Sequence, residues 1–370
     1  MDTYSKPALR VLHVVRQYPP SVGGLEEYVR QLVERQSGSS RVTVLTLDRV
    51  FGSSRKLQRI QRVNHVIVVR VRYVGFRRFF IPFVSPRLLR RYDLIHLHAL
   101  DQFTDLISLY RSLGIPPIVV TSHGLFFHTR KFDKVKDFYF KTISRSTLSR
   151  AKRIFSVSLN DQSKLDEIGI RSEILPNPVE PFPWLYTGRR NLIYWGRISE
   201  NKSVDRLIPF FKHVVETDKT RKLFIVGSGT SSDMQRLTDG IGSAELSESI
   251  FRLGYLDRED LQALITDCGY TVSASRYEGY GMVQVEGMSA GLLPVMQKNA
   301  AFEELFERSG AGLLLDFDDP EAAAERFLDW ENTLQEQERE RARKFALTRA
   351  WSPAAARIEA MYRDVIASSC

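Results

Sequence analysis

A glycine-rich stretch in the C-terminal half decides the fold that the sequence predicts. Residues 273–294 read SASRYEGYGMVQVEGMSAGLLP. The apolar run that leads into it predicts a strand ending near Ser275, then a loop that carries Glu278, then a helix that begins at about Met282. Because ligands of open α/β sheets bind at the carboxyl ends of the strands, this turn is expected to face a ligand.

The same rhythm of short apolar runs and amphipathic segments extends outward from this stretch in both directions. In the C-terminal half it predicts strands at 192–195, 223–226, 250–253, 270–273, 293–296 and 313–315, with helices starting near 202, 257, 282 and 320. In the N-terminal half it predicts strands at 9–15, 42–47, 65–71, 94–98, 118–122 and 154–157, with helices at 25–35 and 134–148. Such alternation is typical of parallel, doubly wound sheets, so we expect two Rossmann-like domains of the α/β class.

The length of the chain and a proline-rich segment place the domain boundary. A chain of 370 residues exceeds the roughly 250–300 residues at which single cores stop growing. The segment 176–183 contains four prolines and no periodicity, which is typical of a linker. We therefore predict an N-terminal domain at 1–180, a C-terminal domain at 181–352 and a final helix at 353–370, with a ligand site between the two domains.

The turn at 278–286 has the chemistry of a sugar-nucleotide site. Backbone N–H groups at a helix start can hold a diphosphate, and the candidates here are Gly279, Tyr280, Gly281 and Met282. Glu286, one turn into the helix, can accept hydrogen bonds from ribose hydroxyls. Glu278, in the loop, is placed nearer the sugar. The alternative is a solvated helix face after an ordinary turn.

A second turn supplies positive charge. Arg197 and Lys202 flank the turn after the first strand of the C-terminal half. Charge-assisted hydrogen bonds to phosphate contribute about 1.5–3 kcal/mol each, and such cations also stabilise charge that develops on a leaving diphosphate. Surface salt bridges are the alternative interpretation.

The N-terminal half offers weaker candidates. Gly23 and Gly24 follow the first predicted strand and open a helix, so the backbone there can approach a phosphate closely. His123 ends a strand at the same edge and is a candidate to bond the donor sugar or position the acceptor, or else a buried structural histidine. His96 and His98 lie on one side of their strand because side chains alternate, and they are candidates for the acceptor region.

Two other patterns favour structural roles. Gly227-Ser-Gly229 follows a strand but lacks the third glycine of a dinucleotide fingerprint, so a simple turn is expected. Asp316 and Asp318 resemble a metal-binding Asp-x-Asp pair, yet Asp319 before Pro320 is typical of a helix cap. We therefore predict no metal site and no cofactor.

Composition and charge suggest where the protein works. With two cysteines, no predicted signal peptide and no long apolar run, we expect a cytoplasmic protein. Residues 1–185 hold 30 Lys and Arg against 15 Asp and Glu, whereas residues 186–370 hold 23 against 29. Basic and aromatic residues interleave at 77–91 and 126–141, which predicts docking on anionic lipid at the inner face of the plasma membrane. Aromatics in the core and solvated arginines are the alternative.

In their order, these motifs resemble those of the family 4 retaining glycosyltransferases, which have the GT-B fold. The resemblance covers the chain from Val11 to about Tyr362, and the stretches 14–19, 46–51, 122–128 and 286–292 are similar to bacterial α-mannosyltransferases of exopolysaccharide synthesis. It implies two domains facing across a cleft, with the last helix packed on the N-terminal domain. It also implies metal-free transfer of mannose from GDP-mannose to a polyprenyl-diphosphate-linked cellobiose.

The resemblance assigns roles to residues and shows two departures. It implies that Arg197 and Lys202 hold the diphosphate, Glu286 the ribose, Glu278 the donor sugar and Gly24 the phosphate from the opposite domain. Pro178 stands where the family usually has glycine, and Gly287 replaces a common alanine. Other donors, UDP-glucose or UDP-N-acetylglucosamine, fit the same motifs. A nucleic-acid-binding protein and a non-catalytic sensor are the remaining alternatives, although no nucleic-acid motif is found.

Overall fold

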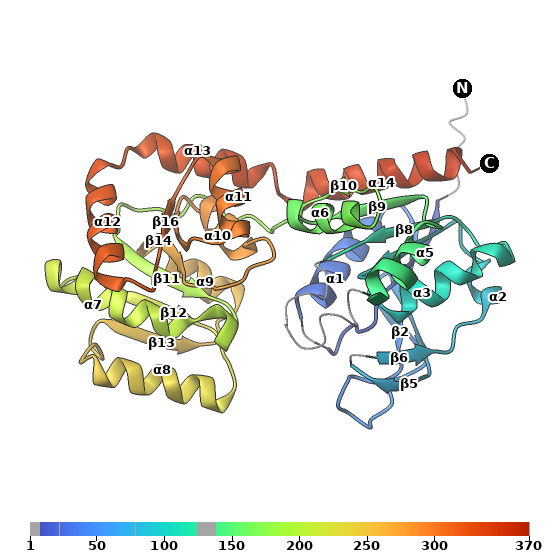
Figure 1. Ribbon diagram of the computed structural model, residues 1–370, viewed down its shortest axis with the longest axis horizontal. Helices are drawn as coiled ribbons and strands as arrows, with labels where there is room; N and C mark the ends of the chain where they lie inside the picture. The colour runs from blue at the N-terminus through green and yellow to red at the C-terminus, as the bar shows by residue number, and fades with distance from the viewer. Residues whose placement is uncertain (1–7, 22, 78, 124–137, 370) are drawn as a thin grey trace. The chain divides into compact units, whose positions relative to one another are not determined.

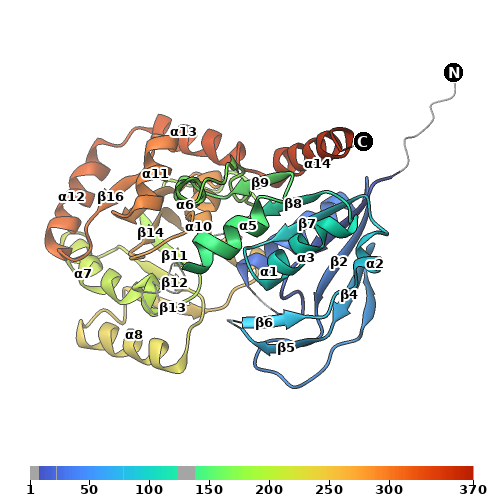
Figure 2. The ribbon, with the colours of Figure 1, turned by 45° about the vertical axis from the view of Figure 1, so that its right-hand side comes forward.

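The chain folds into two compact units. The computed structural model describes residues 8–21, 23–77, 79–123 and 138–369. Unit 1 comprises Met1–Asn177 and Trp351–Cys370, and unit 2 comprises Pro178–Ala350. The chain therefore passes between the units twice, after Asn177 and after Ala350. In both ribbon views each unit is a sheet covered by helices (Figures 1 and 2).

Unit 1 is built on an eight-stranded sheet of order β10-β9-β8-β7-β1-β2-β4-β3. Its strands are β1 (Arg10–Val14), β2 (Arg41–Leu47), β3 (Ile60–Val63), β4 (Val66–Val71), β7 (Leu94–His98), β8 (Ile118–Thr121), β9 (Arg153–Ser156) and β10 (Glu173–Ile174). All neighbours are parallel except β3 and β4, which are antiparallel. A separate antiparallel hairpin is formed by β5 (Tyr73–Phe76) and β6 (Phe79–Pro82).

Helices cover both faces of the unit 1 sheet. They are α1 (Gly24–Gln36), α2 (Pro86–Leu89), α3 (Gln102–Leu109), α5 (Arg145–Leu148), α6 (Leu159–Glu167) and α14 (Trp351–Ala367). The last helix, α14, packs with α1, since Trp351, Ile358 and Tyr362 share a buried cluster with Tyr28 and Leu32. The C-terminal helix is thus part of the N-terminal unit, and this burial of apolar surface holds it there.

Unit 2 has a six-stranded parallel sheet of order β13-β12-β11-β14-β15-β16. The strands are β11 (Asn191–Trp195), β12 (Leu223–Val226), β13 (Ile250–Gly254), β14 (Cys268–Ser273), β15 (Leu293–Gln297) and β16 (Leu313–Leu315). The helices are α7 (Leu207–Thr217), α8 (Ser231–Ser243), α9 (Arg258–Ile265), α10 (Met282–Ser289), α11 (Ala300–Ser309), α12 (Pro320–Thr333) and α13 (Glu336–Leu347). Numbered from β11, the order is 3-2-1-4-5-6, which is that of a doubly wound nucleotide-binding sheet.

The two doubly wound sheets confirm the predicted fold class, but several details of the prediction were wrong. Strand β3 and the β5–β6 hairpin were missed because much of their surface is exposed and they lack the buried apolar run of a parallel strand. The helix predicted near Lys202 begins only at Leu207, because Ser203 has a left-handed backbone (φ 45°) that separates two short 3-10 turns. Of the segment predicted as a helix at 134–148, residues 134–137 lie outside the described residues, and Phe140–Ser144 forms a π-helical turn before α5.

Candidate functional site

The candidate site lies where the strand order of unit 2 reverses. Strands β11 and β14 are parallel neighbours there, and the loops that follow them lie at the carboxyl edge of the sheet. Asn201 ties these loops together: its carbonyl accepts the N–H of Arg276 at 3.1 Å, and its side-chain amide donates to the carbonyl of Tyr277 at 3.0 Å. The two predicted motifs, far apart in sequence, therefore form one site.

Lys202 and Glu278 meet across this junction. The Lys202 ammonium group forms an ion pair with one oxygen of Glu278, and the two side chains keep 27% and 18% of their surface exposed. The other carboxylate oxygen accepts the N–H of Gly279 at 3.1 Å. Because the pair is open to solvent, a phosphate can replace the carboxylate as the partner of Lys202 without burying an unpaired charge.

Arg197 adds a second cation at the same place. Its side chain is exposed and has no hydrogen bond or ion pair with any described residue, while its carbonyl accepts the Tyr194 hydroxyl at 2.7 Å. Burial raises the pKa of Tyr194, the Glu278 carboxylate raises it further, and Arg197 opposes this. Both charges therefore act on one hydroxyl, which places Arg197 and Glu278 in the same neighbourhood.

The start of α10 is shaped by glycine. Gly281 precedes the helix with a left-handed backbone (φ 80°), and a Cβ there would lie 2.8 Å from the Phe302 ring. No described side chain caps the helix, so its first N–H groups remain available for an anion. The side chains of Tyr280 and Met282 pack against the core of unit 2. The loop can thus offer backbone rather than side-chain groups at these two positions.

Glu286 lies one turn into α10 beside Trp195, whose indole N–H donates to it at 3.4 Å. Burial raises the pKa of Glu286 to about 7, and the Trp195 hydrogen bond opposes the rise. The usual pKa of glutamate is 4.5. A carboxylate kept in such surroundings gains from any ligand hydroxyl that donates a hydrogen bond to it.

Close packing around the site was not visible in the sequence. A Cβ on Gly287 would lie 2.2 Å from Cγ2 of Thr271, so α10 sits directly on β14, and this explains the glycine where the family commonly has alanine. A Cβ on Gly227 would lie 1.8 Å from the carbonyl oxygen of Gly196, at a φ of 135°. Gly227 and Gly229 lie in the loop after β12, and the lack of a side chain at these positions lets this loop approach Gly196 and Ile198.

The acidic residues set aside as non-metal groups have structural roles. Asp319 caps α12 by accepting the N–H of Ala322 at 3.2 Å, with Pro320 in the first turn. Asp318 forms an ion pair with Arg206, which lies 3.7 Å from Asp316. The helix cap predicted at Asp319 is confirmed.

In unit 1, the predicted residues lie around the amino end of α1. Gly23 precedes the helix without a described side-chain cap, and a Cβ on Gly24 would meet nothing within 4 Å. The Tyr28 ring, on the first turns of α1, lies edge-on to the ring of His123 with centroids 4.3 Å apart. His123 itself has a positive φ of 52° and follows β8. Gly124, quoted with it in the sequence, lies outside the described residues.

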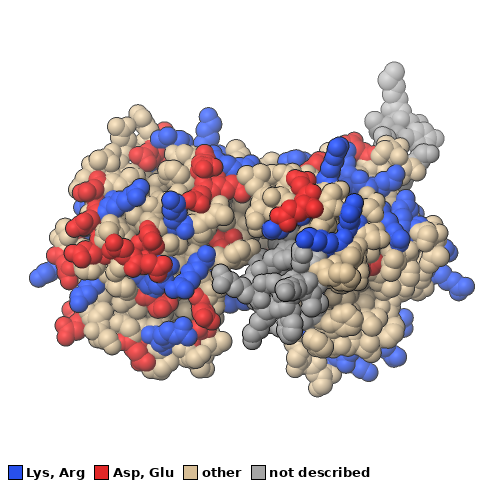
Figure 3. Space-filling model, in the orientation of Figure 1, with Lys and Arg blue, Asp and Glu red and all other residues tan. Residues whose placement is uncertain are grey.

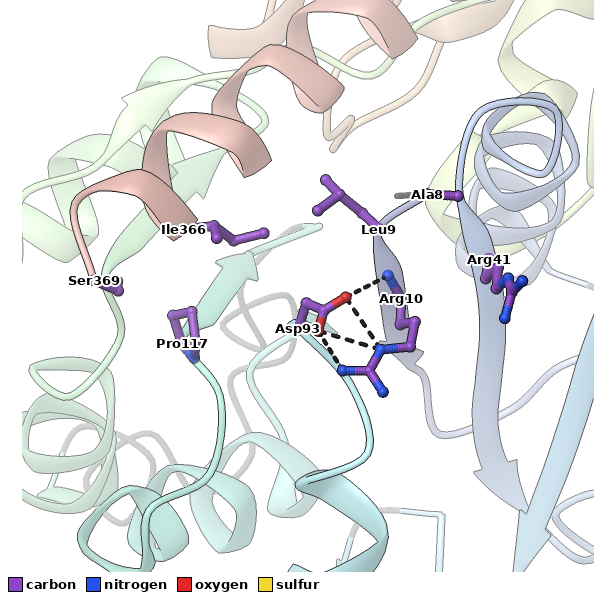
Figure 4. A pocket seen from close by; sticks show the side chains of 8 residues that line it. All are labelled: Ala8, Leu9, Arg10, Arg41, Asp93, Pro117, Ile366 and Ser369. Atoms are coloured by element: carbon purple, nitrogen blue, oxygen red, sulfur yellow. Dashed lines mark hydrogen bonds and ion pairs between the residues drawn. The ribbon is translucent and has the colours of Figure 1, made fainter. Parts of the chain in front are cut away.

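His96 and His98 are buried to 0% and 1% exposure. They are therefore core residues in this structure and do not line an open acceptor surface. A large pocket of unit 1, about 700 Å³, lies elsewhere, at the amino ends of β1, β2 and β8. Figure 4 shows the Arg10–Asp93 ion pair in its wall, with Ile366 of α14 nearby. None of the predicted site residues lines this pocket.

The β5–β6 hairpin carries an apolar exposed face. Val74, Phe76, Phe79, Ile81 and Phe83 are 47–65% exposed, whereas Phe80 is fully buried in the core. On the face drawn in Figure 3, unit 1 shows more Lys and Arg than Asp and Glu, and unit 2 shows both signs intermixed. Of the second basic stretch, residues 126–137 lie outside the described residues. Within the described residues, every helix is too short or too polar to cross a bilayer.

Comparisons with known proteins agree with this architecture. A family model described as "Glycosyltransferase Family 4" matches residues 22–181, and one described as "Glycosyl transferases group 1" matches residues 181–348. The chain is 31% identical over 327 residues to the GDP-mannose:cellobiosyl-diphosphopolyprenol alpha-mannosyltransferase of Xanthomonas oryzae pv. oryzae, with 86% of each chain covered. The protein of the same name from Komagataeibacter xylinus is 27% identical, with 84% of this chain and 81% of that one covered.

Solved structures show the same fold at low sequence identity. Sucrose-phosphate synthase from Thermosynechococcus elongatus superposes with a TM-score of 0.75 and 16% identity, covering 97% of this chain and 99% of that one. HepE from Anabaena, solved in complex with UDP, gives 0.75 and 15%, covering 96% and 100%. At these identities the likeness concerns the fold alone.

Proposed function

The chain belongs to the family 4 glycosyltransferases, and we propose that it transfers mannose from GDP-mannose to a polyprenyl-diphosphate-linked cellobiose with retention of configuration. The donor and acceptor are those in the names of the relatives, which match along most of the chain. The observation in the structure that best supports donor binding is the junction of the two loops at the switch point of unit 2, which brings Lys202 to Glu278.

The proposed roles follow from the chemistry of the donor. Arg197 and Lys202 bind the diphosphate and stabilise its charge as the bond to the sugar breaks. The first N–H groups of α10 add hydrogen bonds to the same group. Glu278, released from Lys202, bonds hydroxyls of the sugar, and Glu286 bonds those of the ribose. Gly24 is proposed to contribute a backbone contact to a phosphate, and His123 to bond the sugar or help to position the acceptor.

Fixed cations supply the charge that a divalent metal would otherwise provide, so we propose that transfer needs neither metal nor cofactor. Addition of EDTA is expected to leave the rate unchanged. A rate that falls with EDTA and returns with Mg²⁺ or Mn²⁺ would reject this part of the proposal.

A donor and acceptor panel tests the reaction. The purified protein is incubated with a cellobiosyl-diphosphate lipid and with GDP-mannose, UDP-glucose or UDP-N-acetylglucosamine, and the lipid product is separated and examined by NMR. We expect an α-linked mannose from GDP-mannose alone. Transfer from a UDP-sugar would replace the donor assignment and leave the family unchanged, whereas tight donor binding without transfer or hydrolysis would favour a sensor.

We also propose that the exposed hairpin docks the protein on the inner face of the plasma membrane, where a lipid-linked acceptor lies. Its aromatic side chains suit the headgroup level, and Arg72 and Arg77 beside it attract anionic lipid. Sedimentation with phosphatidylglycerol vesicles tests this. Replacing Phe76 and Phe79 by serine should weaken binding, while the control Leu347→Ser, an equally apolar exposed change in unit 2, should not. Equal binding by both variants, or preferential binding of nucleic acid over vesicles, would contradict it.

A further inference from the structure

Unit 1 contains a cluster of four histidines that the proposed roles do not use beyond His123. His13 lies in β1, His96 and His98 lie in β7, and His123 lies two residues after β8. The strand register pairs His13 with His96 and His98 with Thr121, so these side chains share one face of the sheet. That face is covered by α1 and α14. Histidines placed in otherwise apolar parallel strands call for an explanation.

Three of the rings are joined end to end. Nδ1 of His13 lies 3.0 Å from Nε2 of His98, and Nδ1 of His98 lies 3.0 Å from Nε2 of His123. Both distances are those of hydrogen bonds. We call these three linked rings, His13–His98–His123, the histidine chain. His98 uses both of its ring nitrogens within it, one as a donor and the other as an acceptor.

A side-chain amide lies near each end of this histidine chain. Gln36 acts on His13 and Asn177 acts on His123, in each case favouring the protonated ring. Four buried polar atoms at these ends have no well-formed hydrogen bond to described residues: Nε2 of His13, both amide atoms of Gln36 and Oδ1 of Asn177. Buried polar atoms left in this state are uncommon in structural cores and are often functional.

His96 stands beside the chain but outside it. Its nitrogens bond the Tyr362 hydroxyl at 2.5 Å and the Thr121 hydroxyl at 2.7 Å. Metal binding is the alternative function for such a cluster, since nitrogens of His13, His96 and His98 lie within 4.8 Å of one another. A metal would have to displace these existing partners, which favours the hydrogen-bonded chain.

All four rings are neutral in the folded protein. Burial lowers the pKa of His13 and of His123 to about 3, and it also lowers the pKa of His96 and His98 well below the usual value for histidine, helped by the neighbouring rings. A neutral imidazole has one donor and one acceptor nitrogen. The protons of the three linked rings are consequently interdependent: if one ring reverses its tautomer, the others must reverse with it.

We propose that His13 and His98 are positioning residues that fix which nitrogen of His123 carries the proton. When Nδ1 of His13 donates, Nδ1 carries the proton in all three rings, and the histidine chain ends on a donor at Nδ1 of His123. In the opposite arrangement Nε2 carries it in all three. A substrate hydroxyl that takes the place of Asn177 beside His123 therefore meets a donor in the first arrangement and an acceptor in the second. His13 and His98, which do not contact that hydroxyl, determine which of the two it meets. This consequence for transfer rests on the proposed function.

Histidine ¹⁵N NMR tests the chain without any assay of activity. Long-range ¹H–¹⁵N correlations distinguish the two tautomers of each ring in the full-length protein. We expect His13, His98 and His123 to share one tautomer. A mixed set in the wild-type protein overturns the proposal, and so does a stoichiometric metal whose removal by chelation moves their signals.

Two variants of His13 separate hydrogen bonding from packing. His13→Leu keeps approximate size but removes the hydrogen bond, whereas His13→Asn leaves a gap but keeps a polar group near Nδ1. We expect His13→Leu to give mixed tautomers at His123 and to lower kcat about tenfold with little change in KM, and His13→Asn to retain the wild-type tautomer and more of the rate. Thr121→Val, which removes the hydroxyl that bonds Nε2 of His96, should leave the His123 signals in place.

The outcomes distinguish this proposal from the function on which it rests. The proposed role of the histidine chain is contradicted if the His123 signals are unchanged in His13→Leu. It is also contradicted if His13→Leu is more active than His13→Asn. Failure of the wild-type protein to use any sugar nucleotide would reject the proposed function. The NMR result would still show whether the three linked histidines share one tautomer.

Discussion

The histidine cluster of unit 1 and the charged loops of unit 2 occupy corresponding places in two similar sheets, yet they use opposite chemistry. In unit 1 the polar groups are buried, neutral and bonded to one another, as in the His13–His98–His123 chain. In unit 2 they are partly exposed and ionised, as in the Lys202–Glu278 pair. The buried neutral groups are suited to orienting hydroxyl groups, and the partly exposed ion pair is suited to compensating phosphate charge, so two similar sheets can support different chemistry.

The largest expected effect comes from removing charge in unit 2. Lys202→Ala should lower kcat by about 100- to 1,000-fold, because one fixed group that stabilises transition-state charge is lost. Arg197→Ala should act similarly. Thermal unfolding should change little, because the Lys202 pair is partly exposed. The matched control is Lys212→Ala, an exposed lysine on α7; if it cost as much as Lys202→Ala, the assignment of Lys202 would fail.

A second effect concerns pH and should arise from unit 2 alone. The pKa of Glu286 is about 7, so below that pH a proton must leave before its carboxylate can accept hydrogen bonds from the ribose. GDP-mannose should therefore bind about tenfold more weakly at pH 6 than at pH 8, as one proton per bound ligand requires. Calorimetry measures this. In Glu286→Gln the affinity should be lower overall and nearly independent of pH, and a persisting tenfold step would assign the titration to another group.

A smaller effect tests the close packing that brings α10 onto β14. Gly287→Ala places a methyl group against Thr271 and should destabilise unit 2 by about 1–3 kcal/mol. Gly242→Ala is the matched control, because that helical glycine has open space around it and alanine favours helices. Denaturant unfolding compares the two, and equal stabilities would show that α10 can shift away from the strand.

A last effect separates stability from function at Glu286. Its pKa is raised in the folded protein from the usual 4.5 to about 7, so stability is lost as pH rises between these values. Glu286→Gln should accordingly raise the melting temperature at pH 8 and leave it almost unchanged near pH 5. A variant that melts lower at pH 8 would contradict the buried setting of this carboxylate.

The sequence predicted those parts of the site that are contiguous in the chain. Glu278 and Glu286 belong to one strand-loop-helix element, and Arg197 and Lys202 belong to one turn, so spacing alone suggested their chemistry. The contacts between elements were not predictable. Asn201 joins its loop to residues 276 and 277, and Trp195 reaches Glu286 across 91 positions.

The same limit explains what was missed in unit 1. The histidine chain depends on the register of β1 against β7, which no local pattern gives. A histidine in the apolar run of β1 was the signal that could have been followed, since a buried polar side chain needs a partner. Strand β3 is largely exposed, with only Gln61 partly buried, and it carries no such signal.

A crystal structure of the protein with GDP tests the central claim most directly. We predict the diphosphate at the switch point between β11 and β14, bonded to Arg197, to Lys202 and to the first N–H groups of α10, with the Lys202–Glu278 ion pair broken. GDP bound elsewhere, with that ion pair intact, would contradict the account.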